Sequence, residues 1–584
     1  MVGLRQQLRM AQISTGTSGG KFLPYSSLKD IISTQVVTDT LTRRRDISPG
    51  TVSKIASFVC GKPEARRIFA ILVWINKTDL IDTFYRYNFI DAILPLYVES
   101  DGTVGTYNTQ SGNSEATHKV FSDERWDEET PDFFCDTQWQ FLSPVFSEHQ
   151  FEYSFHKDHR MPFLKQSSGH RESHFSTVEK WCIHKAHFRK SSRLRISVDK
   201  DGHPMVAVKS LKNVHMNETD YKRAAETEAD VLKMIRGLEH PHLIKAIAYY
   251  KKGTNYFLVF PWAGGGNLRD FWGTDPPRKL DPDFAGWVVD QLCGLAGAME
   301  KLHSAQGTCR HGDLKPENIL CFEDSKRPEP YTQPFLVIAD VGLAKVHSLA
   351  TEMRNEATRT LNGTVMYEPP EAVLLLTKNQ PRSRRYDIWS IGCIYFEFLI
   401  WLLYGKAELV RFGEDITHPV NRTRQFFEVV GSGAAKMNPD VQKWMDWMRR
   451  DPRCAPNTAI RRLLELICTR LLVIEVSKPR SASSGSASTQ NSTTIHEPNG
   501  PDNVKIIRSD TNSSFNGNGP DDLLVRATST EMHEALNNIR KDASGAKPKI
   551  QWLNWQAKSS EGPKQRFGDN LAPYQRGTGR PPWR

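Results

Sequence analysis

The stretch HGDLKPEN at residues 311–318 decides how this sequence is interpreted, because it places a carboxylate, an ammonium and an amide within a few residues. Asp313 can orient an attacking hydroxyl, Lys315 can neutralise charge on a moving phosphoryl group, and Asn318 can give an oxygen to Mg²⁺. An isolated HGD would also fit a capping aspartate in a turn. The LKPEN that follows it and the strong helical pattern that precedes it favour the catalytic interpretation.

Two further motifs lie in fixed order around this stretch, AVK at 207–209 and DVG at 340–342. Lys209 ends a strand-like run, so its ammonium can reach toward phosphate, and Glu228 on the next predicted helix can pair with it. Either residue alone would be interpreted as a surface charge. Asp340 can supply a second oxygen ligand for Mg²⁺. The three motifs together predict phosphoryl transfer.

With these motifs the chain resembles a eukaryotic protein kinase of serine/threonine type. GTVMYEPPE at 363–371 is similar to the end of an activation segment, with Thr364 facing the substrate, and YDIWSIGC at 386–393 is similar to the start of the buried large-lobe helix. LVFPWAGGGNL at 258–268 reads like the hinge of fungal kinases that follow a helical, aromatic N-terminal region. The resemblance implies an α+β, bilobal fold: a small β-rich lobe with one helix and a large α-helical lobe.

The resemblance also implies a set of site residues and the cofactors ATP and Mg²⁺. The catalytic set is Asp313, Lys315, Lys209 and Glu228, and the metal ligands are Asn318 and Asp340. Phe260 is expected as the gatekeeper. The hinge is expected to bind adenine through backbone groups of Pro261, Trp262 and Ala263. The remaining expected nucleotide contacts are Phe175, Val178, Ala207 and Leu320. Glu371 is expected to pair with Arg480, with Arg470 as the competitor.

The phosphate-covering loop departs from the family pattern. The family places glycines there so that backbone amides can approach the nucleotide, but RESHFSTV at 171–178 has Arg171, Ser173 and Ser176 at those positions. Two hypotheses follow. The first is a protein kinase that transfers the γ-phosphate of ATP to Ser or Thr of protein substrates. The second is a pseudokinase scaffold that binds nucleotide weakly or not at all.

Two other departures concern regulation and packing. HGD replaces HRD, so the arginine that usually binds an activation-loop phosphate is absent. We therefore expect activity that does not depend on phosphorylation of Thr351, Thr358 or Thr360. DVG replaces DFG, which puts a smaller side chain at Val341 in the apolar column with His311 and Leu232; Asp340 keeps its metal role.

The bulk composition predicts a chain with a sizeable core. Hydrophobic residues make up 39% and charged residues 25% of 584 residues, and this length predicts more than one structural unit. Nine cysteines without a CxxC pair indicate reduced thiols, so we expect an intracellular protein, cytoplasmic or nuclear, without a signal peptide. The apolar run at 388–404 is long enough for a membrane span, but Glu397 at its centre favours a buried helix.

Changes in composition along the chain predict its domains. We expect a flexible N-terminus at 1–24, a helical accessory region at 25–164, a kinase-like domain at 165–545 and a basic disordered tail at 546–584. Within the domain, the small lobe is expected at about 165–262 and the large lobe at about 263–545. A segment rich in Ser and Asn predicts a disordered insertion at about 483–528.

Three remaining signals bear on partners. His174, Cys182, His184 and His187 are spaced loosely like zinc ligands, but strand alternation would turn some outward, so incidental histidines are favoured. The net charge of +10 lies mainly in residues 547–584, whose tryptophans could stack on nucleic acid; docking onto the chain's own surface is favoured. A regulatory partner bound through the N-terminal helical region is a further hypothesis. These tryptophans are Trp552, Trp555 and Trp583.

Overall fold

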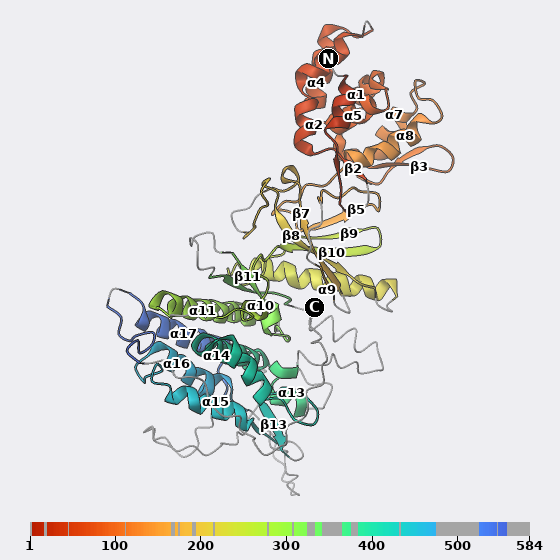
Figure 1. Cartoon of the computed structure of the whole chain (residues 1–584). Helices are drawn as coiled ribbons and strands as arrows, with labels where there is room; N and C mark the ends of the chain where they lie inside the picture. Colours follow the sequence, from red (N-terminus) through yellow and green to blue (C-terminus); the bar gives the residue numbers. More distant parts are fainter. Residues whose placement is uncertain are drawn as a thin grey trace, which may run out of the picture. The chain divides into compact units, whose positions relative to one another are not determined.

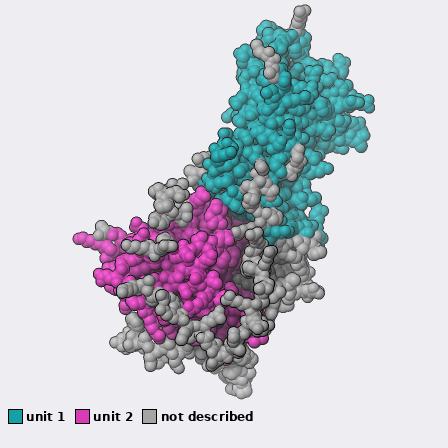
Figure 2. Space-filling model, in the orientation of Figure 1, with its two compact units in different colours: residues 1–229, 245–262 teal, residues 230–244, 263–584 magenta. Residues whose placement is uncertain are grey.

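The computed structural model divides into two compact units. Figure 1 labels the helices and strands along the chain. Unit 1 comprises residues 1–229 and 245–262, and unit 2 comprises residues 230–244 and 263–584; Figure 2 colours the two units separately. The fold is α+β, with the helical accessory region and a β-sheet in unit 1 and a mainly helical unit 2. The structure describes residues 3–557 apart from 17–19, 45, 111, 165–169, 173–175, 190–193, 214–216, 277–279, 306–308, 324–332, 342–364, 375–382, 431–433, 475–524 and 546.

The N-terminal part of unit 1 is helical, and its apolar faces pack into one core. α5 (Arg66–Trp74) is buried from Ile68 to Trp74, because its residues are apolar on nearly all sides. α4 (Pro49–Cys60) begins after Ser48, whose hydroxyl accepts a hydrogen bond from the Thr51 N–H. The other helices are α1 (Leu4–Met10), α2 (Tyr25–Ile31), α3 (Thr34–Thr42), α6 (Ile81–Arg86), α7 (Asn113–Phe121) and α8 (Thr130–Thr137). Two short hairpins join them, β1 (Ile13–Ser14) with β2 (Lys21–Phe22) and β3 (Leu96–Val98) with β4 (Val104–Thr106).

The first residues belong to this fold, so the expectation of a flexible N-terminus over 1–24 is wrong for the residues described. Leu8 in α1 and Leu23 after β2 are buried in the helical core, and Phe22 is buried as well. The error arose because single apolar residues stand among polar neighbours, and their burial depends on contacts with distant helices.

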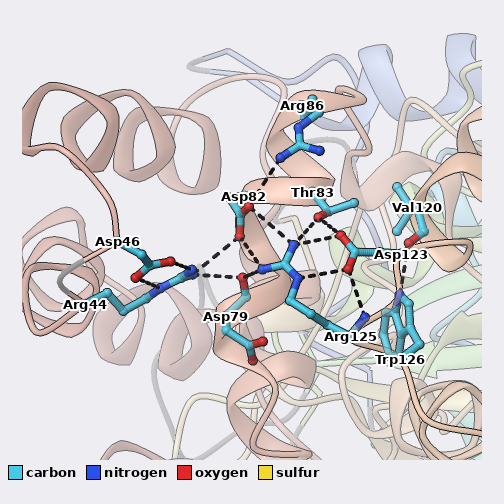
Figure 3. Close-up of polar contacts among 10 residues, drawn as sticks. All are labelled: Arg44, Asp46, Asp79, Asp82, Thr83, Arg86, Val120, Asp123, Arg125 and Trp126. Atoms are coloured by element: carbon cyan, nitrogen blue, oxygen red, sulfur yellow. Dashed lines mark hydrogen bonds and ion pairs between the residues drawn. The ribbon is translucent and has the colours of Figure 1, made fainter.

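A polar network fixes the loops around α6 (Figure 3). The Arg125 guanidinium donates to Asp123 and Thr83 and lies 3.1 Å from the Asp82 carboxylate. Arg44, which follows α3, reaches the same Asp82 and donates to the Asp79 carbonyl at 2.8 Å. The Arg125 guanidinium holds the pKa of Asp123 well below its usual range, through their hydrogen bond. The network therefore ties the segments that follow α3 and α7 to α6 and the turn of helix before it.

A six-stranded sheet forms the second part of unit 1. Its order is β5-β9-β10-β8-β7-β6, antiparallel except that β5 pairs with β9 in parallel. β7 (Ser176–Cys182) and β8 (Met205–Leu211) confirm the β-type runs that the sequence predicted. The other strands are β5 (Glu152–Phe155), β6 (His170–Glu172), β9 (Ala248–Lys252) and β10 (Asn255–Pro261). α9 (Glu218–Gly237) follows β8, and its Asn217 side chain accepts from the Asp220 N–H at 2.8 Å.

The expected boundary between the accessory region and the kinase-like domain, at residues 164 and 165, differs from the structure. β5 is already part of the sheet, and Phe146, Met161 and Phe163 lie in the sheet's core rather than in the helical core. The helical core ends at Leu142. Strand pairing over a large sequence separation places these residues, and their local sequence carries no sign of it.

Unit 2 is mainly helical. α11 (Pro282–Ser304) is capped by Asp281, whose side chain accepts from the Phe284 N–H, and buries one whole side as its apolar stripe predicted. A short hairpin of β11 (Ile319–Phe322) and β12 (Phe335–Ile338) follows the HGDLKPEN stretch. The other elements are α10 (Leu268–Phe271), α13 (Pro370–Leu374), α15 (Pro439–Arg450), α16 (Ala459–Leu466), the π-helical η7 (Ile467–Leu471), α17 (Ser529–Ala543), and the hairpin of β13 (Phe427–Val430) with β14 (Ala434–Met437).

The apolar run at 388–404 lies in α14 (Arg385–Asp415), which bends at Gly405 with a φ of 86°. It is the one described helix that is long and apolar enough to cross a membrane, and 89% of its apolar window is buried inside the protein. Glu397 is buried there and accepts a hydrogen bond from the Tyr367 hydroxyl at 2.6 Å. Such burial and pairing are those of a core helix, as the sequence predicted.

The C-terminal boundaries differ from the expectation as well. Arg526 and Ala527 are buried, so the expected disordered insertion does not extend to 528. Residues 547–557 are not a loose tail: the Gln551 and Trp552 carbonyls accept backbone hydrogen bonds from Ala459 and Ile460. Trp552 docks against α11 at Gly286, which confirms docking onto the chain's own surface for this residue. Trp583 lies outside the described residues.

Candidate active site

Lys209 and Glu228 are brought together in unit 1, on β8 and α9. The Lys209 ammonium lies 2.9 Å from the Glu228 carboxylate, and each side chain is only 5% exposed. An ion pair this well buried fixes the direction of both side chains, because neither can be left without its partner in a low-dielectric interior. The structure therefore holds the Lys209 ammonium in one place, as a phosphate-binding lysine requires.

Three predicted nucleotide contacts share the sheet face of Lys209. Cross-strand pairs lie on one face, and Lys209 is opposite both Val178 and Leu258. Ala207, two residues before Lys209, is opposite Phe260 on the next strand. Because strand residues alternate between faces, Val178, Ala207 and Phe260 all lie on the Lys209 side of the sheet.

The backbone after Phe260 has the donors and acceptors that the adenine prediction needs. The Trp262 N–H donates to the Met205 carbonyl, so Trp262 and Met205 form a hydrogen-bonded pair. Because the two kinds of pair alternate along an antiparallel ladder, the adjacent Pro261 and Val206 form a pair without hydrogen bonds. The Pro261 carbonyl is thus turned away from β8. Proline has no N–H, so Pro261 offers an acceptor only. Ala263 follows and is buried, and its backbone offers an N–H beyond the last strand pair.

The HGDLKPEN stretch gathers three predicted residues in unit 2. Oδ2 of Asp313 lies 2.8 Å from the Lys315 ammonium and accepts from the Asn318 amide at 3.2 Å. The same Asn318 amide donates to the Asp313 carbonyl at 2.8 Å. Oδ1 of Asp313 is buried and has no hydrogen-bond partner among the described residues. A buried carboxylate oxygen without a donor is costly, so this atom has an unused capacity to accept a hydrogen bond.

A buried aspartate in α14 holds the backbone of this stretch. The two oxygens of Asp387 accept the N–H groups of His311 and Gly312, each at 2.8 Å, and His303 lies 2.9 Å away. Burial would raise the pKa of Asp387, but the hydrogen bond from His303 and the nearby histidines outweigh it and lower that pKa. Gly312 has a φ of 76°, a backbone conformation that favours glycine. The ionised carboxylate of Asp387 therefore holds the HGD turn in place through two backbone hydrogen bonds.

Two oxygen donors in unit 2 suit Mg²⁺. The side-chain NH₂ group of Asn318 donates to Asp313, which leaves the side-chain oxygen Oδ1 of Asn318 as the possible metal ligand. Asp340 follows Ala339, whose N–H donates to the backbone carbonyl of Asn318 at 2.8 Å. Asp340 has a φ of 57°. A positive φ outside glycine marks a residue that its surroundings force into place. Leu320, a predicted nucleotide contact, lies on β11 opposite Val337.

Sequence reasoning missed a polar cluster beside this stretch. Arg269 lies 3.2 Å from the carboxylates of both Glu317 and Glu397, and it also hydrogen-bonds to the Tyr367 hydroxyl. Burial and the Glu397 charge raise the pKa of Tyr367 well above its usual value. The cluster ties the segment before Glu371 to α14 and to the HGDLKPEN stretch. Glu397 inside an apolar run was the available signal for a cation nearby.

The expected partner of Glu371 was wrong. Arg526, whose side chain is 0% exposed, donates to both Glu371 oxygens at 2.6 and 3.1 Å. Arg470 instead lies 3.3 Å from Glu531, and Arg480 lies outside the described residues. The resemblance predicted a distal arginine, and the structure places that arginine further along the chain, in the segment between η7 and α17.

Other predicted residues are outside the described part of the chain or serve packing. Phe175, Ser173, His174, Gly342, Thr351, Thr358, Thr360 and Thr364 are outside it. The described residues include no cluster of side chains able to hold a metal through His, Cys, Asp and Glu alone. His187 contacts the Pro144 carbonyl through Nδ1 and accepts the Tyr25 N–H through Nε2, and burial lowers its pKa to about 4. Its two ring nitrogens are thus used within the fold.

Comparison with known proteins agrees with this geometry. Residues 190–448 match the family described as "Protein kinase domain". The chain therefore contains a region, residues 190–448, that is similar to protein kinase domains.

Relatives of this domain are named kinases, and two of the three that follow are named serine/threonine-protein kinases. The chain is 30% identical over 212 residues to a probable myosin light chain kinase of Dictyostelium discoideum, which covers 36% of this chain and 47% of that protein. It is 30% identical over 200 residues to serine/threonine-protein kinase ULK3 of Mus musculus, covering 34% and 37%. It is 29% identical over 253 residues to serine/threonine-protein kinase unc-51 of Caenorhabditis elegans, covering 43% and 25%. The chain thus spans between a quarter and half of the length of these relatives.

Proposed function

We propose that this chain is an active protein kinase that transfers the γ-phosphate of ATP to Ser or Thr hydroxyls of protein substrates in the presence of Mg²⁺. One observation supports this most strongly: Asp313 keeps one buried carboxylate oxygen without a donor while the other is held by Lys315 and Asn318. A hydroxyl that donates to Oδ1 is oriented for attack, and its proton has an acceptor.

The other residues have distinct parts in this proposal. Lys209, fixed by Glu228, binds phosphate oxygens, and Lys315 offsets charge that develops on the transferred group. Asn318 and Asp340 supply oxygens for Mg²⁺, which when bound neutralises phosphate charge. Val178, Ala207, Phe260 and Leu320 offer apolar surface to the adenine, and the Pro261 carbonyl and Ala263 N–H offer polar contacts.

A pseudokinase scaffold is the second candidate, and one observation favours it. Ser176 takes the place of a glycine of the phosphate-covering loop, and its side chain is buried at the start of β7, opposite Leu211. A side chain there limits how closely backbone amides can approach a phosphate. The residues that carry the transfer are nevertheless all present, which favours the enzyme.

A labelling experiment separates the two candidates. The full chain is incubated with γ-labelled ATP, Mg²⁺ and a mixture of casein and myelin basic protein. The kinase proposal expects label on Ser and Thr of the substrates, abolished by EDTA and reduced at least about 100-fold in Asp340→Asn, which loses a metal ligand. Absence of label in the wild-type chain, with ATP binding intact or lost, would support the scaffold instead.

A further inference from the structure

The sheet of unit 1 has a second face, opposite the one that carries Lys209. Trp181 and Glu179 on β7 lie there, since they alternate with Val178 and Lys180 along the strand. Tyr250 on β9 is paired with Phe257 on β10, and both are on this same face because Phe257 is opposite Ser210, the neighbour of Lys209. This face is largely covered by the segment around Phe146 and Met161.

Two adjoining cavities remain on this face. The larger, of about 370 Å³, is lined by Met161, Trp181 and Tyr250, with Glu179 and the backbone of Gly16 beside them. A cavity of about 280 Å³ lies next to it, against the turn between β9 and β10. Lys252 and Phe257 line both cavities. The smaller one is also lined by Lys157, Gly253, Thr254 and Asn255.

The two cavities differ in charge. Lys157 and Lys252 both border the smaller one, and neither ammonium has an ion pair or hydrogen bond among the described residues. Asp158 attracts Lys252 at longer range, but its carboxylate is 3.3 Å from His156. The Lys252 ammonium is half-buried, and this burial lowers its pKa. An anion in the smaller cavity would therefore meet two cations that lack close partners.

The larger cavity has aromatic walls, and the carboxylate that borders it, that of Glu179, already accepts a hydrogen bond. The Trp181 indole N–H donates to Glu179 at 3.2 Å. Gly16 lies so close that a Cβ there would come within 2.5 Å of the Trp181 ring, so the ring is held in place from the side. What this cavity offers a ligand is a fixed apolar and aromatic wall.

We propose that these cavities bind an extended peptide segment of a partner protein, with an aromatic side chain in the larger cavity and an acidic or phosphorylated side chain two residues further on in the smaller one. The spacing supports a peptide: Tyr250 and Lys252 are two residues apart on one strand, about 6.6 Å, the distance between alternate side chains of an extended chain. The site is independent of phosphoryl transfer, because it lies on the sheet face opposite Lys209.

Calorimetry with short peptides tests this proposal on the full chain. The probe is a blocked pentapeptide whose central residues are phenylalanine, serine and aspartate, and a second probe has phosphoserine in place of the aspartate. Saturable binding of both indicates an acidic partner, and binding of the second alone indicates a phosphorylated one. Replacing the aspartate by lysine, or the phenylalanine by alanine, is expected to weaken binding about tenfold or more.

The chain offers a matched control. Lys252→Met is expected to weaken binding of the aspartate or phosphoserine probe about tenfold, and Lys252→Arg to restore most of it. Lys251→Met removes the same charge from the opposite sheet face, where Lys251 lies over the Tyr256 ring, and is expected to bind normally. Phe257→Ala is expected to bind the phenylalanine probe no better than the alanine probe.

Three results would overturn the proposal. No saturable binding of either probe at millimolar concentration overturns the proposal. Equal loss in Lys252→Met and Lys251→Met, with unchanged melting temperatures, overturns it too, because that result would assign binding to net charge alone. Equal affinity for the lysine peptide would do the same.

Discussion

The pairing of Arg526 with Glu371 gives the most demanding prediction about this fold, because local sequence pointed elsewhere. The Arg526 guanidinium is fully buried and contacts Glu371 through two hydrogen bonds. It also donates to the carbonyls of Val473 and Arg385, and it lies 5.2 Å from the centre of the Trp389 ring. Arg526→Ala removes all of these contacts at once.

The size of the effect follows from what the substitution leaves behind. The Glu371 side chain is 21% exposed, so water can take over part of its solvation. The Val473 and Arg385 carbonyls lose donors inside the protein, at about 1–3 kcal/mol for each buried group left unsatisfied. Breaking a buried ion pair costs about 3–5 kcal/mol, and we expect Arg526→Ala to lower the free energy of unfolding by that amount.

Urea denaturation followed by tryptophan fluorescence and circular dichroism measures this loss. Arg470→Ala is the matched control: Arg470 and Glu531 are 43% and 52% exposed, and such a surface pair is worth at most about 1 kcal/mol. Our reasoning is refuted if Arg526→Ala unfolds at the wild-type urea concentration, or if Arg470→Ala is the more destabilised variant.

Three further predictions address other parts of the chain. Lys209→Met should lower the phosphotransfer rate about 100-fold or more while Lys251→Met leaves it unchanged, measured with γ-labelled ATP; equal rates would contradict the role of Lys209. Burial raises the pKa of Asp91 to about 6 in the folded state, above its ordinary value of 3.8. Because the folded pKa is the higher one, the stability that this group contributes is full well below pH 3.8 and is lost as the pH rises through 6. Wild type should therefore lose about 2 kcal/mol relative to Asp91→Asn between pH 4 and 7 in denaturant titrations; a pH-independent difference would be inconsistent with this. Finally, alanine at Thr351, Thr358 and Thr360 together should leave phosphotransfer within about twofold, because Gly312 replaces the phosphate-binding arginine, and loss of activity would argue against it.

Local sequence predicted the residues whose neighbours are close in the chain. The Asp313, Lys315 and Asn318 contacts all form within one turn, and the Lys209 to Glu228 pair joins a strand to the helix that follows it. Patterning also predicted the burial of the apolar run in α14, because a helix that is apolar on all sides is not stable when exposed to water.

Contacts between distant segments could not be predicted in this way. Arg526 pairs with Glu371 across 155 positions, and no local pattern singles it out among the arginines. β5 joins the sheet through a parallel pair with β9, although nothing in its four residues indicates a partner that distant. Arg269 lies on the short helix α10, and only Glu397 in the middle of an apolar run indicated that a nearby cation was needed.

The central claim is that Asp313 acts on the substrate hydroxyl, and one paired measurement tests it most directly. The rate of γ-phosphate transfer at saturating ATP is compared between the wild-type chain and Asp313→Asn, with ATP binding by calorimetry measured alongside. We expect equal ATP affinity and a transfer rate lower by about 100-fold or more in the variant. Equal transfer rates in the two proteins would contradict this account.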